Sequence, residues 1–264
     1  MTNALLDVHA TLPDFNAIKV DQIKPALDEI LKDNREAIAA LLTQTDFSWS
    51  NFMAPLEALE ARLDHMWSTV EHLHAVKNDE AIRAVYAVCI ADLTAYHTEN
   101  SQNEALYLAV KHIAESDAFE ALNPAQQKIL QDELRDFKLA GVHLKAKDKK
   151  RFARLQADYV QLTTQFENHV LDATHDFQCH ITDESRLKGL PQATLDQAKK
   201  TAESNDKPGW VFSLDFPVFH AIMQFADDAD LRQTFYEAYC TKASDQGPGK
   251  GQWDNSEVMT SILT

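Results

Sequence analysis

The chain has 264 residues, which suffices for one large domain or two smaller ones, each with a hydrophobic core. Its 25 Lys and Arg residues against 41 Asp and Glu residues give a formal charge of −16. Such a surface repels phosphate backbones, so we expect no nucleic-acid partner. The 3 cysteines lack CxxC spacing, which favours a reducing compartment. With no apolar run near the ~20 residues that span a bilayer, and no signal peptide, we expect a cytoplasmic protein away from membranes.

Few helix breakers, 6 glycines and 8 prolines, favour long helices. After an extended segment over residues 1–20, a first helix is predicted from near Pro25, because proline suits the first helical turn. Apolar residues at helical spacing predict the helices that follow. They lie over about 51–76, around 82–96, around 106–113, from Pro124 to before Gly141, and, the longest, over about 147–171.

The period changes after Leu171. Alternating apolar and polar residues predict short strands over 175–181 and 210–216, the second with Trp210, Phe212, Leu214 and Phe216 on one side. A short helix over 192–204 and the turn 205–209 separate the strands, and two helices are expected near 217–226 and 229–243. We therefore predict a mainly α fold, with a helical region over 1–174 and a mixed strand and helix region over 175–264.

A glycine-rich loop, 244–251, precedes what is predicted to be a new amphipathic helix from about Asp254. Its apolar residues from Val258 to Leu263 begin a stripe that the chain does not complete. A native domain seldom stops inside such a helix, so we expect a truncated piece. An exposed apolar surface of this kind also favours dimerisation of the chain.

No catalytic, cofactor-binding or metal-binding residue is predicted. Zinc hydrolases place two histidines four positions apart on a helix, with a glutamate after the first, and no pair of the 11 histidines fits this pattern. His65 and His72 would lie ~10.5 Å apart on a helix, and His72 and His74 would point to different sides. His175, Cys179 and His180 fall on a predicted strand, with the first two ~13 Å apart. Ordinary structural histidines explain these sets better than a metal site.

Other catalytic motifs are also missing or weak. The chain has no Gly-x-Ser-x-Gly elbow, and Gly247-x-Gly249-x-Gly251 lacks the order of a phosphate loop. Cys89 falls on an apolar helix stripe and Cys240 next to one, which is typical of core thiols. The basic cluster over 145–154 is interpreted as the solvated first turns of a helix, with an anion-binding patch as the weaker alternative.

Several segments, in order along nearly the whole chain, resemble the bacterial oligopeptidase A group within the thimet oligopeptidase family of zinc metallopeptidases. These are the opening MTNALL with LPDF and IKPAL, Val76–Asn78, Leu134–Gly141, Asn168–Thr174, Ile181–Glu184, Ala243–Pro248 and Trp253–Ser256. Nothing resembles the catalytic half of that family.

The resemblance implies that this chain is the amino-terminal helical lobe of a neurolysin-like, two-lobed peptidase. Such enzymes are cytoplasmic zinc endopeptidases that cut short peptides in a deep channel. The lobe would wall that channel and admit slender substrates, and its partner would be the missing carboxy-terminal catalytic lobe. Zinc would belong to the full-length parent, so the chain alone is expected to be inactive and to bind no cofactor. The alternative is a helical scaffold module that binds a peptide or a partner helix without catalysis.

Overall fold

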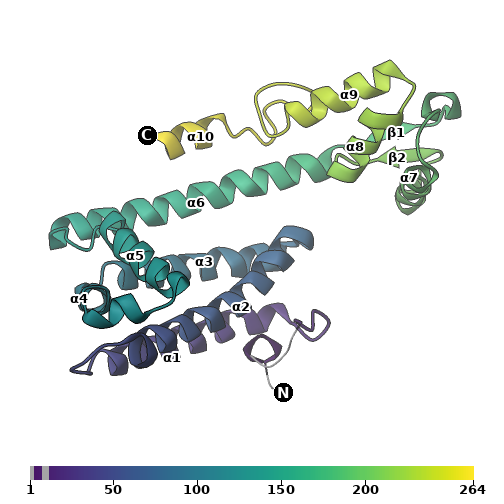
Figure 1. The fold of residues 1–264 in the computed structure, drawn as a ribbon. Coiled ribbons are helices and arrows are strands. Elements are labelled where there is room, and N and C mark those ends of the chain that lie inside the picture. The colour runs from purple at the N-terminus through teal and green to yellow at the C-terminus, as the bar shows by residue number, and fades with distance from the viewer. Residues whose placement is uncertain (1–2, 8–11) are drawn as a thin grey trace. The chain divides into compact units, whose positions relative to one another are not determined.

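The computed structural model describes residues 3–7 and 12–264. These residues are mainly helical, with one two-stranded sheet (Figure 1), which confirms the predicted fold class. The chain divides into two compact units, Met1–Gln161 and Leu162–Thr264, called the amino-terminal and carboxy-terminal units below. The boundary between the units falls within one long helix. The predicted division between 1–174 and 175–264 stays a prediction.

The amino-terminal unit is built from helices joined by short connections. They are α1 Ile23–Leu41, α2 Ala54–Val76, α3 Glu80–Ser101, α4 Glu104–Ala114, α5 Pro124–Leu139 and the first part of α6 Ala146–Asp176. A π-helical turn, Trp49–Met53, leads into α2. The segment predicted as extended is corrected in its described part, where 3₁₀ turns form at Ala4–Leu6 and Val20–Gln22. In the first of them, the Asn3 side chain accepts a hydrogen bond from the Leu5 amide, which favours a turn.

Helix ends follow the cap residues that the sequence offers. Asn78 ends α2 with a positive φ of 47°, and the Asp79 side chain accepts from the Ile82 amide at the start of α3. Asn123 and Gln126 form a reciprocal capping box ahead of α5. At its other end, Gly141 has a φ of 79°, as a C′ residue requires. These contacts confirm the predicted boundaries.

Helices α1, α2 and α3 pack against one another, as do α4 and α5, around one hydrophobic core. The predicted apolar faces supply that core, whose largest fully buried side chains include Leu27, Ile30, Phe52, Leu63, Met66, Tyr96 and Ile113. Removing such side chains from water is the main driving force for folding this unit.

Helix α6 differs from its prediction. It extends to Asp176 instead of ending near Leu171, and it has no buried residue. Its predicted stripe is only partly covered, with Leu155 and Tyr159 about half exposed at 56% and 49%. The amphipathic pattern therefore predicted the helix correctly. It wrongly predicted that one face of the helix is buried in the core.

The carboxy-terminal unit contains the sheet. Strands β1 Cys179–Ile181 and β2 Trp210–Phe212 pair antiparallel, with Cys179 opposite Phe212 and Ile181 opposite Trp210. Helix α7 Gln192–Ser204 packs on β2, and α8 Phe216–Phe225 packs on α9 Ala229–Cys240. Helix α10 Ser256–Leu263 follows the glycine-rich loop. The core of this unit includes Leu187, Phe212, Leu214, Ile222, Leu231 and Phe235.

Both strands are shorter than predicted. His175 belongs to α6, so the first strand begins only at Cys179. The second ends at Phe212, because Phe216 starts α8 and is exposed, with Pro217 in its first turn. Val211 is buried on the side opposite the predicted apolar face, since α7 covers β2. In the part of the chain that the structure describes, no helix is both long enough and apolar enough to cross a membrane.

Candidate functional site

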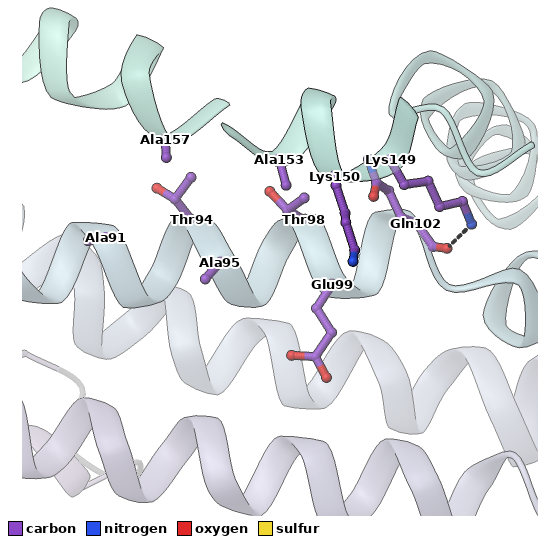
Figure 2. A pocket seen from close by; sticks show the side chains of 10 residues that line it. All are labelled: Ala91, Thr94, Ala95, Thr98, Glu99, Gln102, Lys149, Lys150, Ala153 and Ala157. Atoms are coloured by element: carbon purple, nitrogen blue, oxygen red, sulfur yellow. Dashed lines mark hydrogen bonds between the residues drawn. The ribbon is translucent and has the colours of Figure 1, made fainter. Parts of the chain in front are cut away.

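The amino-terminal unit contains two neighbouring hollows, which share Thr94 and Thr98 of α3. The first, called the furrow, has a volume of about 340 Å³ and lies between α3 and the start of α6 (Figure 2). In Figure 2, Ala153 and Ala157 of α6 face the two threonines, and these short side chains leave the space open. Glu99, Gln102, Lys149 and Lys150 make one end of the furrow polar.

Two hydrogen bonds tie the end of α3 to the start of α6 and to the end of α5. Lys149 Nζ donates to the Gln102 carbonyl over 2.8 Å (Figure 2), and Gln102 Nε2 donates to the Ala140 carbonyl over 3.1 Å. These bonds satisfy carbonyls near helix ends that lack intrahelical partners. The other residues of the basic cluster, Lys145, Lys147, Lys150, Arg151 and Arg154, are exposed, as expected for solvated first turns.

The second hollow, called the acidic groove, is larger, at about 630 Å³. Helices α2 to α6 line it, and the lining combines apolar and acidic side chains. The apolar ones are Leu56, Leu106, Phe137, Tyr159 and Val160, the acidic ones Glu57, Glu60, Glu133 and Asp136, and others include His97, Asn100 and Gln156. This volume lies within the range of small-molecule and side-chain pockets.

The carboxylates reach the groove as two pairs. Glu57 and Glu60 are three positions apart on α2, and Glu133 and Asp136 are three apart on α5. Residues three apart lie on the same face of a helix, so each helix turns both of its carboxylates to the same side. Because the two helices line one hollow, four acidic side chains meet in it.

Glu133 has the most perturbed carboxyl group of the groove. Burial, together with the nearby carboxylates of Glu57, Asp136, Glu60 and Asp132, raises its pKa from the ordinary 4.5 to about 7. The pKa of Glu60 is also raised, first by burial and then by Asp64. A protonated Glu133 relieves part of the repulsion among these side chains near neutral pH.

Cations compensate this charge only in part. The Arg135 guanidinium pairs with Asp136, with Nε–Oδ1 and Nη2–Oδ2 distances of 2.8 and 3.1 Å. Among the described residues, no Lys or Arg pairs with Glu57, Glu60 or Glu133, and none lines the groove. The groove therefore keeps excess negative charge.

A buried polar network forms the wall behind Glu60. Asn34, fully buried on α1, donates through Nδ2 to the Tyr96 hydroxyl over 3.3 Å. The hydroxyl in turn donates to Glu60 Oε1 over 3.4 Å. The network links α1 to the groove through α3, and it positions the Glu60 carboxylate from behind.

Comparison with known proteins shows what the helical region around the groove resembles. Residues 27–150 match the family model of the neurolysin/thimet oligopeptidase N-terminal domain. Residues 27–150 thus resemble the amino-terminal domain of the thimet oligopeptidase family. The acidic groove and its wall lie within or next to this domain, since all of their residues fall between positions 34 and 160.

Similarity to known proteins extends beyond residues 27–150. Over 264 residues, all of this chain, it is 39% identical to oligopeptidase A of Haemophilus influenzae and 37% identical to oligopeptidase A of Escherichia coli. It is 28% identical over 259 residues to the probable cytosolic oligopeptidase A of Arabidopsis thaliana. The chain spans about two fifths of the length of these bacterial relatives, 39% in each case.

Several histidines of the two units have structural partners of their own. His72 packs on Phe15 and His74 stacks on Tyr86, with ring centroids 5.5 and 4.0 Å apart. His175 lies on α6, whereas His180 on β1 lies with Nε2 2.6 Å from the Pro208 carbonyl. Within residues 3–7 and 12–264, no three His, Cys, Asp or Glu side chains are placed to hold a metal ion. Among the described residues, no set of side chains therefore fits the zinc that the resemblance implies; His9 lies outside these residues.

Of the two cysteines predicted to be core thiols, the structure confirms one. Cys89 is buried in the core of the amino-terminal unit, and burial raises its thiol pKa to about 11, so it is a poor nucleophile. Cys240, expected to be a core thiol, is exposed near the end of α9.

The acidic groove was not predicted from the sequence. The spacing of three between acidic residues on α2 and α5 was the available signal, but it is common on solvated helix faces.

Proposed function

We propose that this chain is the amino-terminal, channel-forming lobe of a zinc-dependent oligopeptidase that hydrolyses short peptides. The observation that supports this most is similarity along the whole chain, at 37–39% identity, to bacterial proteins named oligopeptidase A. Because the chain spans 39% of their length, the zinc site and the catalytic residues would lie in the remaining part. A cytoplasmic location belongs to the same proposal.

In this proposal the chain binds and selects substrate and performs no bond cleavage. Its helices would form one wall of a channel that admits slender peptides and excludes bulky ones by steric hindrance. The zinc ion, when bound by the other lobe, would activate water for attack on the peptide carbonyl. The chain by itself would be inactive and would hold no cofactor, and its partner would be the catalytic lobe.

A second candidate is a helical module that binds a peptide or a partner helix without any catalytic lobe. The acidic groove, with its apolar side chains, and the exposed residues Met259 and Leu263 of α10 favour a binding surface. Dimerisation of the chain, through exposed apolar surface that the catalytic lobe would otherwise cover, is compatible with either candidate.

A peptide cleavage assay separates the two candidates. The purified chain is incubated with a short fluorogenic peptide, with and without zinc, and again after addition of the separately produced carboxy-terminal part of Haemophilus influenzae oligopeptidase A. The lobe proposal expects no cleavage by the chain alone and cleavage on mixing, above that of the added part by itself. Zinc-dependent cleavage by the chain alone contradicts it. The scaffold alternative expects saturable peptide binding but no gain in cleavage on mixing.

A further inference from the structure

We propose that the acidic groove binds the basic side chain of a peptide, with an arginine guanidinium among the carboxylates of Glu57, Glu60 and Glu133. The inference rests on the proposed function in taking peptides as the ligands of this lobe. It adds a site and a charge preference that the family assignment does not contain.

The volume and lining of the groove suit such a side chain. About 630 Å³ is available, and Leu56, Leu106 and Phe137 offer apolar surface beside the carboxylates. An arginine side chain has the same division, with an apolar stem and a charged planar head. The stem can lie against the apolar side chains while the head reaches the acidic ones.

Charge complementarity selects a cation as the occupant. Asp136 already has Arg135 as its partner, so three groove carboxylates remain without a Lys or Arg ion-pair partner among the described residues. Within the described part of the chain, the hydrogen bond that Glu60 accepts is the long one from Tyr96, at 3.4 Å. A guanidinium brings five N–H donors in a fixed plane, which can satisfy several carboxylate oxygens together. The formal charge of −16 on the chain also attracts basic peptides over longer distances.

The neighbouring furrow does not offer the same site. Its polar end carries Lys149 and Lys150 (Figure 2), and its Glu99 is already paired with Arg35 at 2.9 Å. A cation would meet positive charge there. The preference for a basic group is therefore specific to the acidic groove.

Arrival of a guanidinium also changes the protonation of the groove. Glu133 has a pKa of about 7, so near neutral pH it carries a proton in a sizeable fraction of molecules. The groups that face it are Glu57 and Glu60 from α2, His97 from α3, and Asp132, Arg135 and Asp136 on its own helix. A bound cation favours the ionised carboxylate, so binding releases protons and strengthens from pH 6 to pH 8.

The test is calorimetric titration of the 264-residue chain with two short peptides that differ at one position. One carries arginine, and the other carries citrulline, which has nearly the same shape without the charge. We expect the arginine peptide to bind about tenfold more tightly at pH 8, by the strength of charge-assisted hydrogen bonds. Glu133→Gln and Glu60→Gln should each reduce that preference severalfold. Glu29→Gln, at an exposed site on α1, removes the same charge outside the groove and should leave it unchanged.

Three results overturn the proposal: equal binding of the two peptides, no binding of either, or an arginine preference that Glu133→Gln and Glu29→Gln reduce alike. Spermidine that binds the groove as tightly as the arginine peptide overturns the assignment to a peptide side chain. The cleavage assay with the catalytic part tests the lobe function separately. Cleavage on mixing without an arginine preference refutes only this site. An arginine preference without cleavage on mixing refutes only the lobe function.

Discussion

The Asn34 side chain donates to the hydroxyl of Tyr96 across 3.3 Å in the buried interior of the amino-terminal unit, joining α1 to α3. Asn34 Nδ2 also lies 3.3 Å from the Leu59 carbonyl of α2, so one amide group connects three helices. Both contacts are long for hydrogen bonds, yet the Tyr96 hydroxyl and the Leu59 carbonyl are the polar partners that the structure gives this buried nitrogen.

This relationship predicts the effect of Tyr96→Phe. The change removes the acceptor and leaves one amide hydrogen of Asn34 buried without a partner, which costs about 1–3 kcal/mol. We expect urea unfolding followed by helical circular dichroism to show a loss of that size in the amino-terminal unit. The matched control is Tyr236→Phe, at a ring that is 56% exposed on α9, which should change little. Equal stability of the two variants would contradict a structural role for the buried contact.

The groove carboxyl of Glu133 makes the stability of the chain depend on pH. Its folded-state pKa of about 7 lies above the ordinary 4.5, so the folded chain binds more protons than the unfolded chain between these values. Stability therefore falls as pH rises from about 4.5 to 7, and the full cost persists at higher pH.

Glu133→Gln should remove that cost. Since the group is partly exposed, we expect the variant to be more stable than the wild type by about 1–3 kcal/mol at pH 9 and nearly equal to it at pH 5. Thermal unfolding at both pH values measures the difference. Glu29→Gln provides the control, with no pH-dependent gain. A variant of Glu133 that is destabilised at pH 9 would show that its carboxylate is favourably paired.

Asn255 fixes the start of α10 to the second part of α6. It is 4% exposed, its Nδ2 donates to the Phe166 carbonyl over 3.0 Å, and its Oδ1 lies 2.8 Å from His169 Nδ1. Asn255→Ala removes both contacts and leaves polar atoms of α6 without these partners. We expect hydrogen exchange of the Ser256–Leu263 amides to accelerate by about tenfold or more. Gln252→Ala, an exposed site nearby, should leave the exchange rates unchanged.

Gly209 is required by the turn before β2. It has a φ of 88°, and a Cβ there would lie 2.4 Å from the Ile181 carbonyl oxygen. Gly209→Ala therefore combines backbone strain with a clash against backbone, and we expect a loss of about 2–4 kcal/mol in the carboxy-terminal unit. Gly249→Ala is the control, because no atom lies within 4 Å of its Cβ position. Chemical unfolding of the two variants measures the contrast, and similar stabilities would mean that the turn relaxes freely.

Local signals in the sequence were sufficient for most helices. Asn123-Pro124 and Asn78-Asp79 predicted helix boundaries because caps act through neighbouring backbone groups. Helix α7 has the predicted bounds, Gln192–Ser204. The ends of the strands were harder to predict: Phe216 continues the alternating pattern but starts a helix, since Pro217 favours a first helical turn.

Features that depend on contacts between helices far apart in the sequence could not be predicted. The acidic groove requires α2 and α5 to line one hollow, and nothing in either helix encodes its neighbour. The raised pKa of Glu133 depends on the same meeting, because Glu57 and Glu60 belong to the other helix. The stripe on α6 predicted a buried face, but burial depends on what covers it, and Leu155 stays half exposed.

The most direct test of the lobe function is a fusion. The chain is joined to the carboxy-terminal part of Haemophilus influenzae oligopeptidase A, in place of the 39% of that enzyme that it matches, and cleavage of short and long peptides is measured. We predict zinc-dependent cleavage of the short peptides, exclusion of the long ones, and little activity from the carboxy-terminal part alone. A folded fusion that cleaves no peptide, or that cleaves short and long peptides equally, would contradict the account.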